Sequence, residues 1–151
     1  MKIKVSLSES RGQKPRPKND SDLGFGQYFT DHMFKLDYSG DQGWHAPRIE
    51  PYGPLDLDPA AMVLHYNQEV FEGMKAYHLP DGDAAIFRPD KNIERMNKSL
   101  SRMSMPELDP DVFVAAIREL VWLERSWIPE SEGTSLYIRP TAIATEPALG
   151  V

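Results

Sequence analysis

Two side chains near the end of the sequence have the types and the spacing to bind a carboxylate. Tyr137 and Arg139 alternate with Leu136 and Ile138 in a strand-like run, and alternate residues of a strand point to the same face. A phenol and a guanidinium on one face can together hold a carboxylate. A salt bridge between Arg139 and a carboxylate on a neighbouring strand is at least as consistent with the spacing, so both interpretations stay open.

Gly73 marks a second place of interest, inside the hairpin pattern of residues 64–88. Two apolar runs flank the turn Pro80-Asp81-Gly82-Asp83, which is typical of a β-hairpin. A glycine inside such a run indicates a tight bend or the close approach of a ligand. Tyr66 and Phe71 crowd the entry to this bend, and on these residues alone an ordinary hairpin with two core aromatics is favoured. The residues expected to serve the sheet are Met74, Ala76, Ile86 and Phe87.

The rest of the sequence offers no recognisable catalytic pattern. It contains no glycine-rich phosphate loop, no nucleophile elbow and no histidine pair at metal-ligand spacing. Its four histidines are scattered singly and its carboxylates are not singled out by spacing, so we predict no metal site and no catalytic residue. The absence of cysteine excludes disulfides and thiol nucleophiles. From spacing alone, the sequence indicates an α+β domain with a candidate anion site.

Length and charge indicate one soluble, cytoplasmic domain. A chain of 151 residues can bury a core without disulfides, and it has neither the apolar start of a signal peptide nor a stretch of membrane-spanning length. Its net charge is -6, yet residues 1–22 hold six of the 17 basic residues and three of the 23 acidic ones. The acidic body argues against nucleic-acid binding. Residues 1–22 are expected to form a basic, extended and solvated arm, which could also touch an anionic partner.

Strands are expected on both sides of a proline-rich connection. Alternating apolar side chains predict a half-buried strand over 32–38, and residues 44–49 can return as its partner. Four prolines punctuate residues 47–59, which favours a long irregular connection over a central strand. A further strand is expected over 133–140.

Two helices are expected between the hairpin and the last strand. The first has Asp90 as its N-cap and stops before Pro106. The second begins at Asp109-Pro110 and stops before Pro129. Apolar residues at helical spacing predict the buried faces, which are Ile93, Met96, Leu100 and Met103 in the first helix and Phe113, Ala116, Ile117, Leu120, Leu123 and Trp127 in the second.

Four blocks of sequence, each weak alone, form a specific ordered set. The blocks are Phe25-Gly26 with Phe29-Thr30-Asp31-His32-Met33; Leu64-His65-Tyr66 with Phe71-Glu72-Gly73-Met74-Lys75-Ala76; Phe87-Arg88-Pro89 with Asn92, Arg95-Met96, Ser99, Arg102-Met103 and Pro106; and Gly133-Thr134-Ser135-Leu136-Tyr137-Ile138-Arg139-Pro140 with Glu146-Pro147 and Leu149-Gly150-Val151. In this order they resemble the N-terminal domain of branched-chain aminotransferases, which are pyridoxal-phosphate enzymes of fold type IV. The resemblance implies an α+β fold with an antiparallel or mixed sheet packed against two main helices. It also implies that residues 23–151 form an incomplete domain that lacks its last strand.

The resemblance implies a role for each candidate site residue. In the family, the arginine in the position of Arg95 binds the cofactor phosphate, and a planar guanidinium can grip two phosphate oxygens. Tyr137 and Arg139 match positions that line the substrate site, where the arginine binds the distal carboxylate of glutamate. The positions of the apolar side-chain pocket are matched by Phe25, Tyr66, Phe71, Leu149 and Val151. In a homodimer, the last segment and Tyr66 would reach the partner subunit's site.

The implied activity is transamination by a cytoplasmic homodimer. An amino group would move between leucine, isoleucine or valine and 2-oxoglutarate through pyridoxal 5'-phosphate, so the expected partners are these amino acids, glutamate and their 2-oxo acids. The family's Schiff-base lysine belongs to a C-terminal domain, and no lysine of this sequence occupies that context. Lys75 lies in a strand motif and is rejected as the catalytic base. We therefore expect this chain alone to be inactive, as a fragment without the cofactor-lysine domain.

Two other interpretations stay open. The apolar residues 149–151 and an unfinished sheet edge could belong to a non-catalytic module that dimerises with, or regulates, a full-length relative. Among enzymes of the same fold, a D-amino-acid aminotransferase or an aminodeoxychorismate lyase is the alternative. The matches over 71–75 and 137–139 favour the branched-chain group over both.

Overall fold

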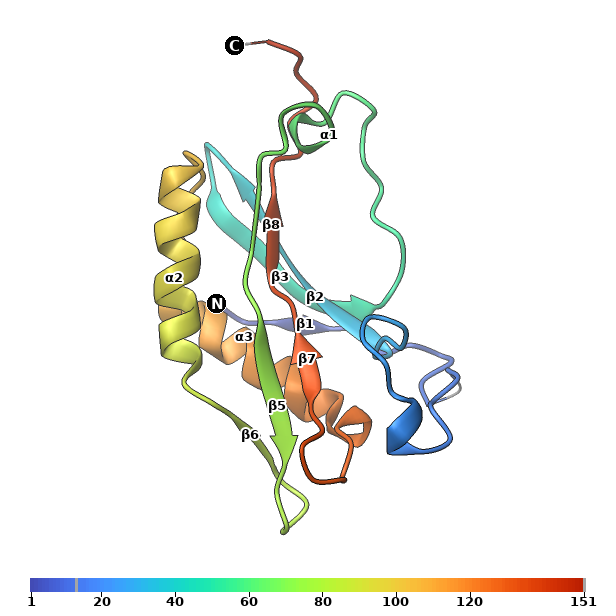
Figure 1. Ribbon diagram of the computed structural model, residues 1–151. Coiled ribbons are helices and arrows are strands. Elements are labelled where there is room, and N and C mark those ends of the chain that lie inside the picture. The colour runs from blue at the N-terminus through green and yellow to red at the C-terminus, as the bar shows by residue number, and fades with distance from the viewer. Residues whose placement is uncertain (13, 151) are drawn as a thin grey trace.

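A computed structural model describes residues 1–12 and 14–150, and within them it has three small sheets and two main helices (Figure 1). The first sheet has the order β1-β3-β2, formed by β1 (Lys4–Val5), β2 (His32–Ser39) and β3 (Gly43–Pro51). β2 and β3 are antiparallel, whereas β1 runs parallel to β3. The mixed sheet confirms this part of the expected α+β fold class.

The other two sheets form one interrupted ribbon. β4 (Glu69–Phe71) pairs antiparallel with β8 (Thr141–Ile143), and β5 (Met74–His78) lies between β7 (Leu136–Ile138) and β6 (Ala84–Ile86). The pairing is broken after Phe71, where the N–H of Glu72 donates to the carbonyl of Pro140 at 3.0 Å. Glu72 and Gly73 therefore lie beside residues 139–140.

The two main helices cover this ribbon and close the core. α2 spans Pro89–Arg102 and α3 spans Pro110–Leu123. The predicted N-cap of α3 is confirmed, because the side chain of Asp109 accepts the N–H of Asp111 at 2.8 Å. For α2 the prediction is wrong: Arg88 holds the cap position with a left-handed backbone (φ 48°), and Asp90 lies in the first turn. The buried core consists of Val70, Met74, Ala76, Ile93, Met96, Leu100, Phe113, Ile117, Val121 and Ile128.

Three local predictions are corrected by the structure. Residues expected to be strand at 64–66 belong to the short helix α1 (Met62–Tyr66), because the N–H groups of Met62 and Val63 donate to carbonyls of the segment after β8. The expected irregular connection is instead strand β3 as far as Pro51. Pro47 fits there because the register shifts opposite it, between Lys35 and Asp37, so no ladder N–H is needed at that position.

The third correction concerns Phe87, which does not serve the sheet. It follows the end of β6 and is 75% exposed, whereas Met74 and Ala76 are buried as expected. Two 3-10 turns, η1 (Asp20–Asp22) and η2 (Arg125–Trp127), complete the elements.

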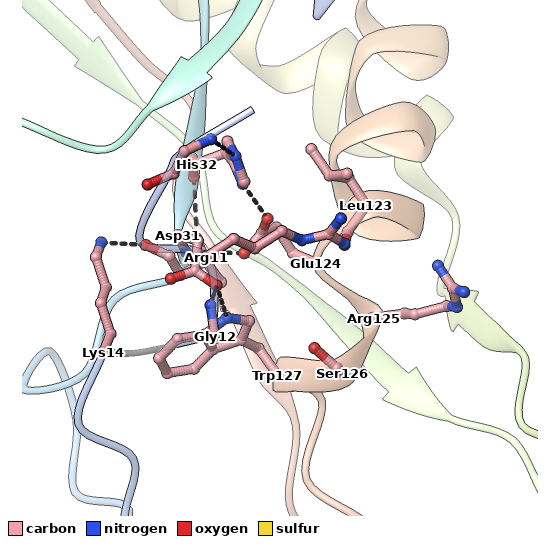
Figure 2. Close-up of polar contacts among 12 residues, drawn as sticks. Arg11, Gly12, Lys14, Asp31, His32, Leu123, Glu124, Arg125, Ser126 and Trp127 are labelled. Carbon is pink, nitrogen blue, oxygen red and sulfur yellow. Dashed lines mark hydrogen bonds and ion pairs between the residues drawn. The ribbon is translucent and has the colours of Figure 1, made fainter. Parts of the chain in front are cut away.

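Most residues of the basic N-terminal arm are exposed, as expected, but the arm is also anchored by hydrogen bonds to residues far along the chain. Within it, the N–H of Ser8 donates to His32 Nε2 at 2.8 Å, and the N–H of Gly12 donates to Asp31 Oδ2 at 3.1 Å. His32 is itself buried and bonded to the buried Glu124 through Nδ1 (Figure 2). Three of the six cations of the arm donate to backbone carbonyls, with Arg11 on Leu123, Lys14 on Thr30 and Arg16 on Ser126. Partners far along the chain thus hold the arm in place.

Among the described residues, no helix is both long enough and apolar enough to cross a membrane.

Candidate functional site

A hollow of about 390 Å³ lies where β5, β7 and the first turns of α2 meet. Of the residues that the structure describes, four cations and no carboxylate line it. We call it the cationic hollow, and its lining is Gly73, Met74, Lys75, Tyr77, Phe87, Arg88, Lys91, Asn92, Arg95 and Tyr137. Clustered positive charge around a concave surface favours the binding of an anion.

Arg95 reaches the hollow from the second turn of α2 and is held by Glu72. Its Nε lies 2.9 Å from Glu72 Oε1 and its Nη2 lies 2.8 Å from Glu72 Oε2, a two-point ion pair. The hydrogen bonds that Arg95 donates to Glu72 raise the pKa of Arg95 above its usual value. Burial acts to raise the pKa of Glu72, but the hydrogen bonds from Arg95 and Asn92 outweigh it and the pKa is lowered. Both groups are therefore charged at neutral pH.

Gly73 brings Tyr137 to the same hollow. A β-carbon at residue 73 would collide with the hydroxyl of Tyr137 and lie 3.0 Å from its Cζ. The sequence indicated a tight bend or the approach of a ligand at this glycine. The structure shows a close approach, but the approaching group is the Tyr137 ring.

Four of the predicted substrate-site residues, Tyr137 among them, lie in contact with one another beside the cationic hollow. The ring of Phe25 meets the ring of Tyr137 edge-on at 5.0 Å between centroids. The guanidinium carbon of Arg139 lies 4.7 Å from the centre of the Phe71 ring and 5.5 Å from that of Tyr137. Within the described part of the chain, no carboxylate is within ion-pair distance of Arg139. The alternative of a cross-strand ion pair is therefore not what the structure shows.

Two other predicted residues are not brought to the hollow. Tyr66 ends α1 and Leu149 lies in the last segment, and both are exposed. α1 and that segment are joined by a bridge between Ala61 and Pro147, and Figure 1 places them at the opposite end of the ribbon from the start of α2. Val151, also predicted for the pocket, lies outside the described residues.

Sequence reasoning missed the residues that support Arg95. Glu72 belonged to a recognised block but had no role assigned, and Arg88, Lys91 and Asn92 were not named as site residues. The i,i+3 spacing of Asn92 and Arg95 was an available signal, because it places both on one face of α2. Glu72 gave no such signal, since its two side-chain partners lie 20 and 23 residues away.

Comparison with known proteins identifies relatives for nearly the whole chain, although no protein-family model matches it. Branched-chain-amino-acid transaminase 1 of Bacillus subtilis (strain 168) is 59% identical over 139 residues, which cover 92% of this chain and 38% of that protein. The branched-chain-amino-acid aminotransferase of Mycolicibacterium smegmatis (strain ATCC 700084 / mc(2)155) is 51% identical over 129 residues, covering 85% and 35% respectively.

Solved structures agree with the sequence comparison. The T.th. branched-chain amino acid aminotransferase complexed with N-(5'-phosphopyridoxyl)-L-glutamate matches with a TM-score of 0.55 and 30% identity, over 68% of this chain and 32% of that chain. The same enzyme complexed with 4-methylvaleric acid matches with a TM-score of 0.56 and 31% identity, over 68% of this chain and 32% of that chain. In sequence and in fold, the chain is thus similar to branched-chain aminotransferases, and it spans about 40% of the length of the curated relatives that it matches.

Proposed function

We propose that this chain is the N-terminal domain of a branched-chain amino acid aminotransferase and supplies its phosphate-binding arginine and one side of its substrate pocket. The observation that carries the proposal is the convergence of Arg95, Gly73 and Tyr137 on the cationic hollow. Guanidinium and ammonium donors are the donor set that an organic phosphate needs, and Glu72 takes up only one edge of the Arg95 guanidinium. The residues present therefore fit pyridoxal 5'-phosphate.

Each part of the site has a distinct task in this proposal. Bound pyridoxal 5'-phosphate supplies the electron sink that allows an amino group to move between an amino acid and a 2-oxo acid. Arg95 holds the phosphate, while Arg88 and Lys91 at the same rim add positive charge. Tyr137 and Arg139 orient the substrate from the neighbouring face.

The pocket formed by this face suits both aliphatic and acidic side chains. Phe25 and Phe71 provide apolar walls, and Arg139 rests against the aromatic rings when no carboxylate is present. An aliphatic substrate therefore leaves the guanidinium with a favourable partner, whereas glutamate offers it a carboxylate. Support comes from the T.th. relative, which binds a phosphopyridoxyl-glutamate and also 4-methylvaleric acid.

A homodimer would account for the two predicted residues that lie away from the hollow. Tyr66 and Leu149 are exposed at the opposite end of the ribbon. We propose that they complete the pocket of the partner subunit. Dimerisation would then bury apolar side chains that are exposed to water in the single chain.

A chimeric enzyme tests the proposal. This chain would replace the matching segment of the Bacillus subtilis transaminase 1, and glutamate formation from 2-oxoglutarate would be measured with leucine and with D-alanine as alternative amino donors. We expect the chimera to use leucine, and Arg95→Ala in the chimera to lose cofactor on dialysis. A folded chimera that prefers D-alanine would contradict the branched-chain assignment.

The chain by itself is expected to form no glutamate. Incubation with pyridoxal 5'-phosphate, leucine and 2-oxoglutarate, followed by borohydride reduction, should show in a peptide map no lysine that is modified above the non-specific labelling of exposed lysines. Lys75 is the informative position, because it lines the cationic hollow. Turnover together with modification of Lys75 would overturn its rejection as the catalytic base.

A further inference from the structure

The two-point ion pair between Arg95 and Glu72 leaves one edge of the guanidinium free. A guanidinium has five N–H groups. Glu72 takes one on Nε and one on Nη2, at 2.9 and 2.8 Å. The remaining N–H groups, two on Nη1 and one on Nη2, form a second fork at the tip of the side chain. Among the described residues Glu72 is the only hydrogen-bond partner of Arg95, whose side chain is 57% exposed and lines the cationic hollow.

Glu72 is in turn held by groups that do not depend on Arg95. The buried Asn92 donates one amide hydrogen to Glu72 Oε2 at 2.9 Å and the other to the carbonyl of Gly73 at 3.0 Å. The N–H of Gly73 also donates to Glu72 Oε2, at 3.2 Å. Only 12% of the Glu72 side chain is exposed. These hydrogen bonds therefore hold the Glu72 carboxylate in one position between the ribbon and α2.

We propose that Glu72 is a positioning residue, which orders the plane of Arg95 so that the free fork presents two N–H groups to an oxyanion in the cationic hollow. The inference rests on the proposed function, since the oxyanion there is the phosphate of the cofactor. It adds a residue that touches neither cofactor nor substrate. A carboxylate this close to an anion site repels the anion, so its presence is useful only through the order it imposes on Arg95.

The two effects of Glu72 have opposite signs, and this makes them separable. Removing its charge strengthens anion binding if charge dominates, because the hollow becomes more positive. Replacing one of its two acceptor oxygens by an amide group breaks the two-point pair and weakens binding if positioning dominates, because an exposed arginine must then lose its rotamer freedom when the anion arrives. We expect positioning to dominate and Glu72→Gln to weaken phosphate binding about tenfold, the loss of roughly one charge-assisted hydrogen bond.

The test is a titration of the whole chain with inorganic phosphate at constant ionic strength, followed by NMR through the backbone amide signal of Lys91, which lines the hollow in every variant. The side-chain Nε–H signal of Arg95, where present, reports its exchange rate. Glu69→Gln is the matched control, because Glu69 is an exposed carboxylate on β4 and its loss changes the net charge equally. Glu72→Asp keeps the charge but is one methylene shorter, so it cannot reach both Nε and Nη2. Arg95→Ala defines the background level of binding.

Support would be weaker binding by both Glu72→Gln and Glu72→Asp, with Glu69→Gln unchanged and the Arg95 Nε–H exchanging faster in both variants. Equal or tighter binding by Glu72→Gln would overturn the positioning role and leave the proposed function standing. Phosphate binding by the unmodified chain no stronger than that of Arg95→Ala would overturn both. If Glu72→Gln does not fold, Glu72→Asp and the exchange rate in the unmodified chain decide the question, since a rapidly exchanging Arg95 Nε–H contradicts the ion pair itself.

Discussion

The substitution Gly73→Ala tests the contact that fixes Tyr137 beside the cationic hollow. A β-carbon at residue 73 would collide with the Tyr137 hydroxyl and lie 3.0 and 3.1 Å from Cζ and Cε2 of the ring. Gly73 is not among the residues with a left-handed backbone, so alanine there brings no conformational strain of its own. Relief of the collision requires the ring to move. We expect the free energy of unfolding to fall by about 1–3 kcal/mol, the usual cost of overpacking.

Urea unfolding of the purified variants measures this cost. The matched control is Gly53→Ala, since a β-carbon at Gly53 would meet no atom within 4 Å. That control should leave the free energy of unfolding unchanged or raise it by up to about 1 kcal/mol, because alanine restricts the unfolded chain. A similar loss in both variants would mean that the close approach at Gly73 is not the cause.

A double-mutant cycle identifies the colliding group. Tyr137→Phe removes the hydroxyl but keeps the ring, so Gly73→Ala should cost at least about 1 kcal/mol less in the Tyr137→Phe background than in the unmodified chain. An equal cost in the two backgrounds would refute the reasoning, because the hydroxyl would then not be the atom that Gly73 accommodates.

Two further predictions concern capping and acid stability. Asp109→Ala should lower the free energy of unfolding by about 1 kcal/mol through loss of the N-cap of α3, whereas Asp90→Ala, which removes a first-turn charge but no cap, should cost about 0.3 kcal/mol in urea unfolding. Burial acts to raise the pKa of Asp31, but hydrogen bonds from Trp127 and Gly12 lower it below the ordinary 3.8. The stability that Asp31 adds is thus present above that value and is lost as the pH falls through the lowered pKa, so Asp31→Asn should flatten the decline in stability below about pH 4. An unchanged decline would contradict this role.

Local patterns predicted the helices well because their signals lie within a few residues of each other. The apolar spacing of Ile93, Met96 and Leu100 identified the buried side of α2, and Asp109-Pro110 identified the start of α3. The strand pairing of β2 with β3 followed from alternation in the same way.

Contacts between distant segments account for the errors. α1 forms where a strand was expected because its first N–H groups meet carbonyls near residue 146, which no local pattern reveals. The anchoring of the N-terminal arm was not predicted, because its hydrogen-bond partners Asp31, His32 and Leu123 lie in other parts of the sequence. Periodicity cannot report such contacts, since their distance along the chain is arbitrary.

The residues of the candidate site likewise separate into those that the sequence predicts and those that only contacts between distant segments reveal. Tyr137 and Arg139 were recognised as a pair from strand alternation alone, and Phe25 and Phe71 joined them through the family resemblance. Glu72 was found only in the structure, because its role comes from the meeting of the ribbon with α2. The roles of Arg95 and of the substrate residues, the homodimer and the cytoplasmic location stay predictions.

Arg95 is proposed to bind the phosphate of pyridoxal 5'-phosphate, and every other role assigned to the cationic hollow depends on this contact. Equilibrium dialysis of the chain with pyridoxal 5'-phosphate measures it directly, with Arg102→Ala as control because Arg102 lies on the same helix outside the hollow. Arg95→Ala should weaken binding by about 1.5–3 kcal/mol, the loss of a charge-assisted contact, while Arg102→Ala binds as the unmodified chain does. Equal retention of the cofactor by Arg95→Ala and the unmodified chain would contradict the account.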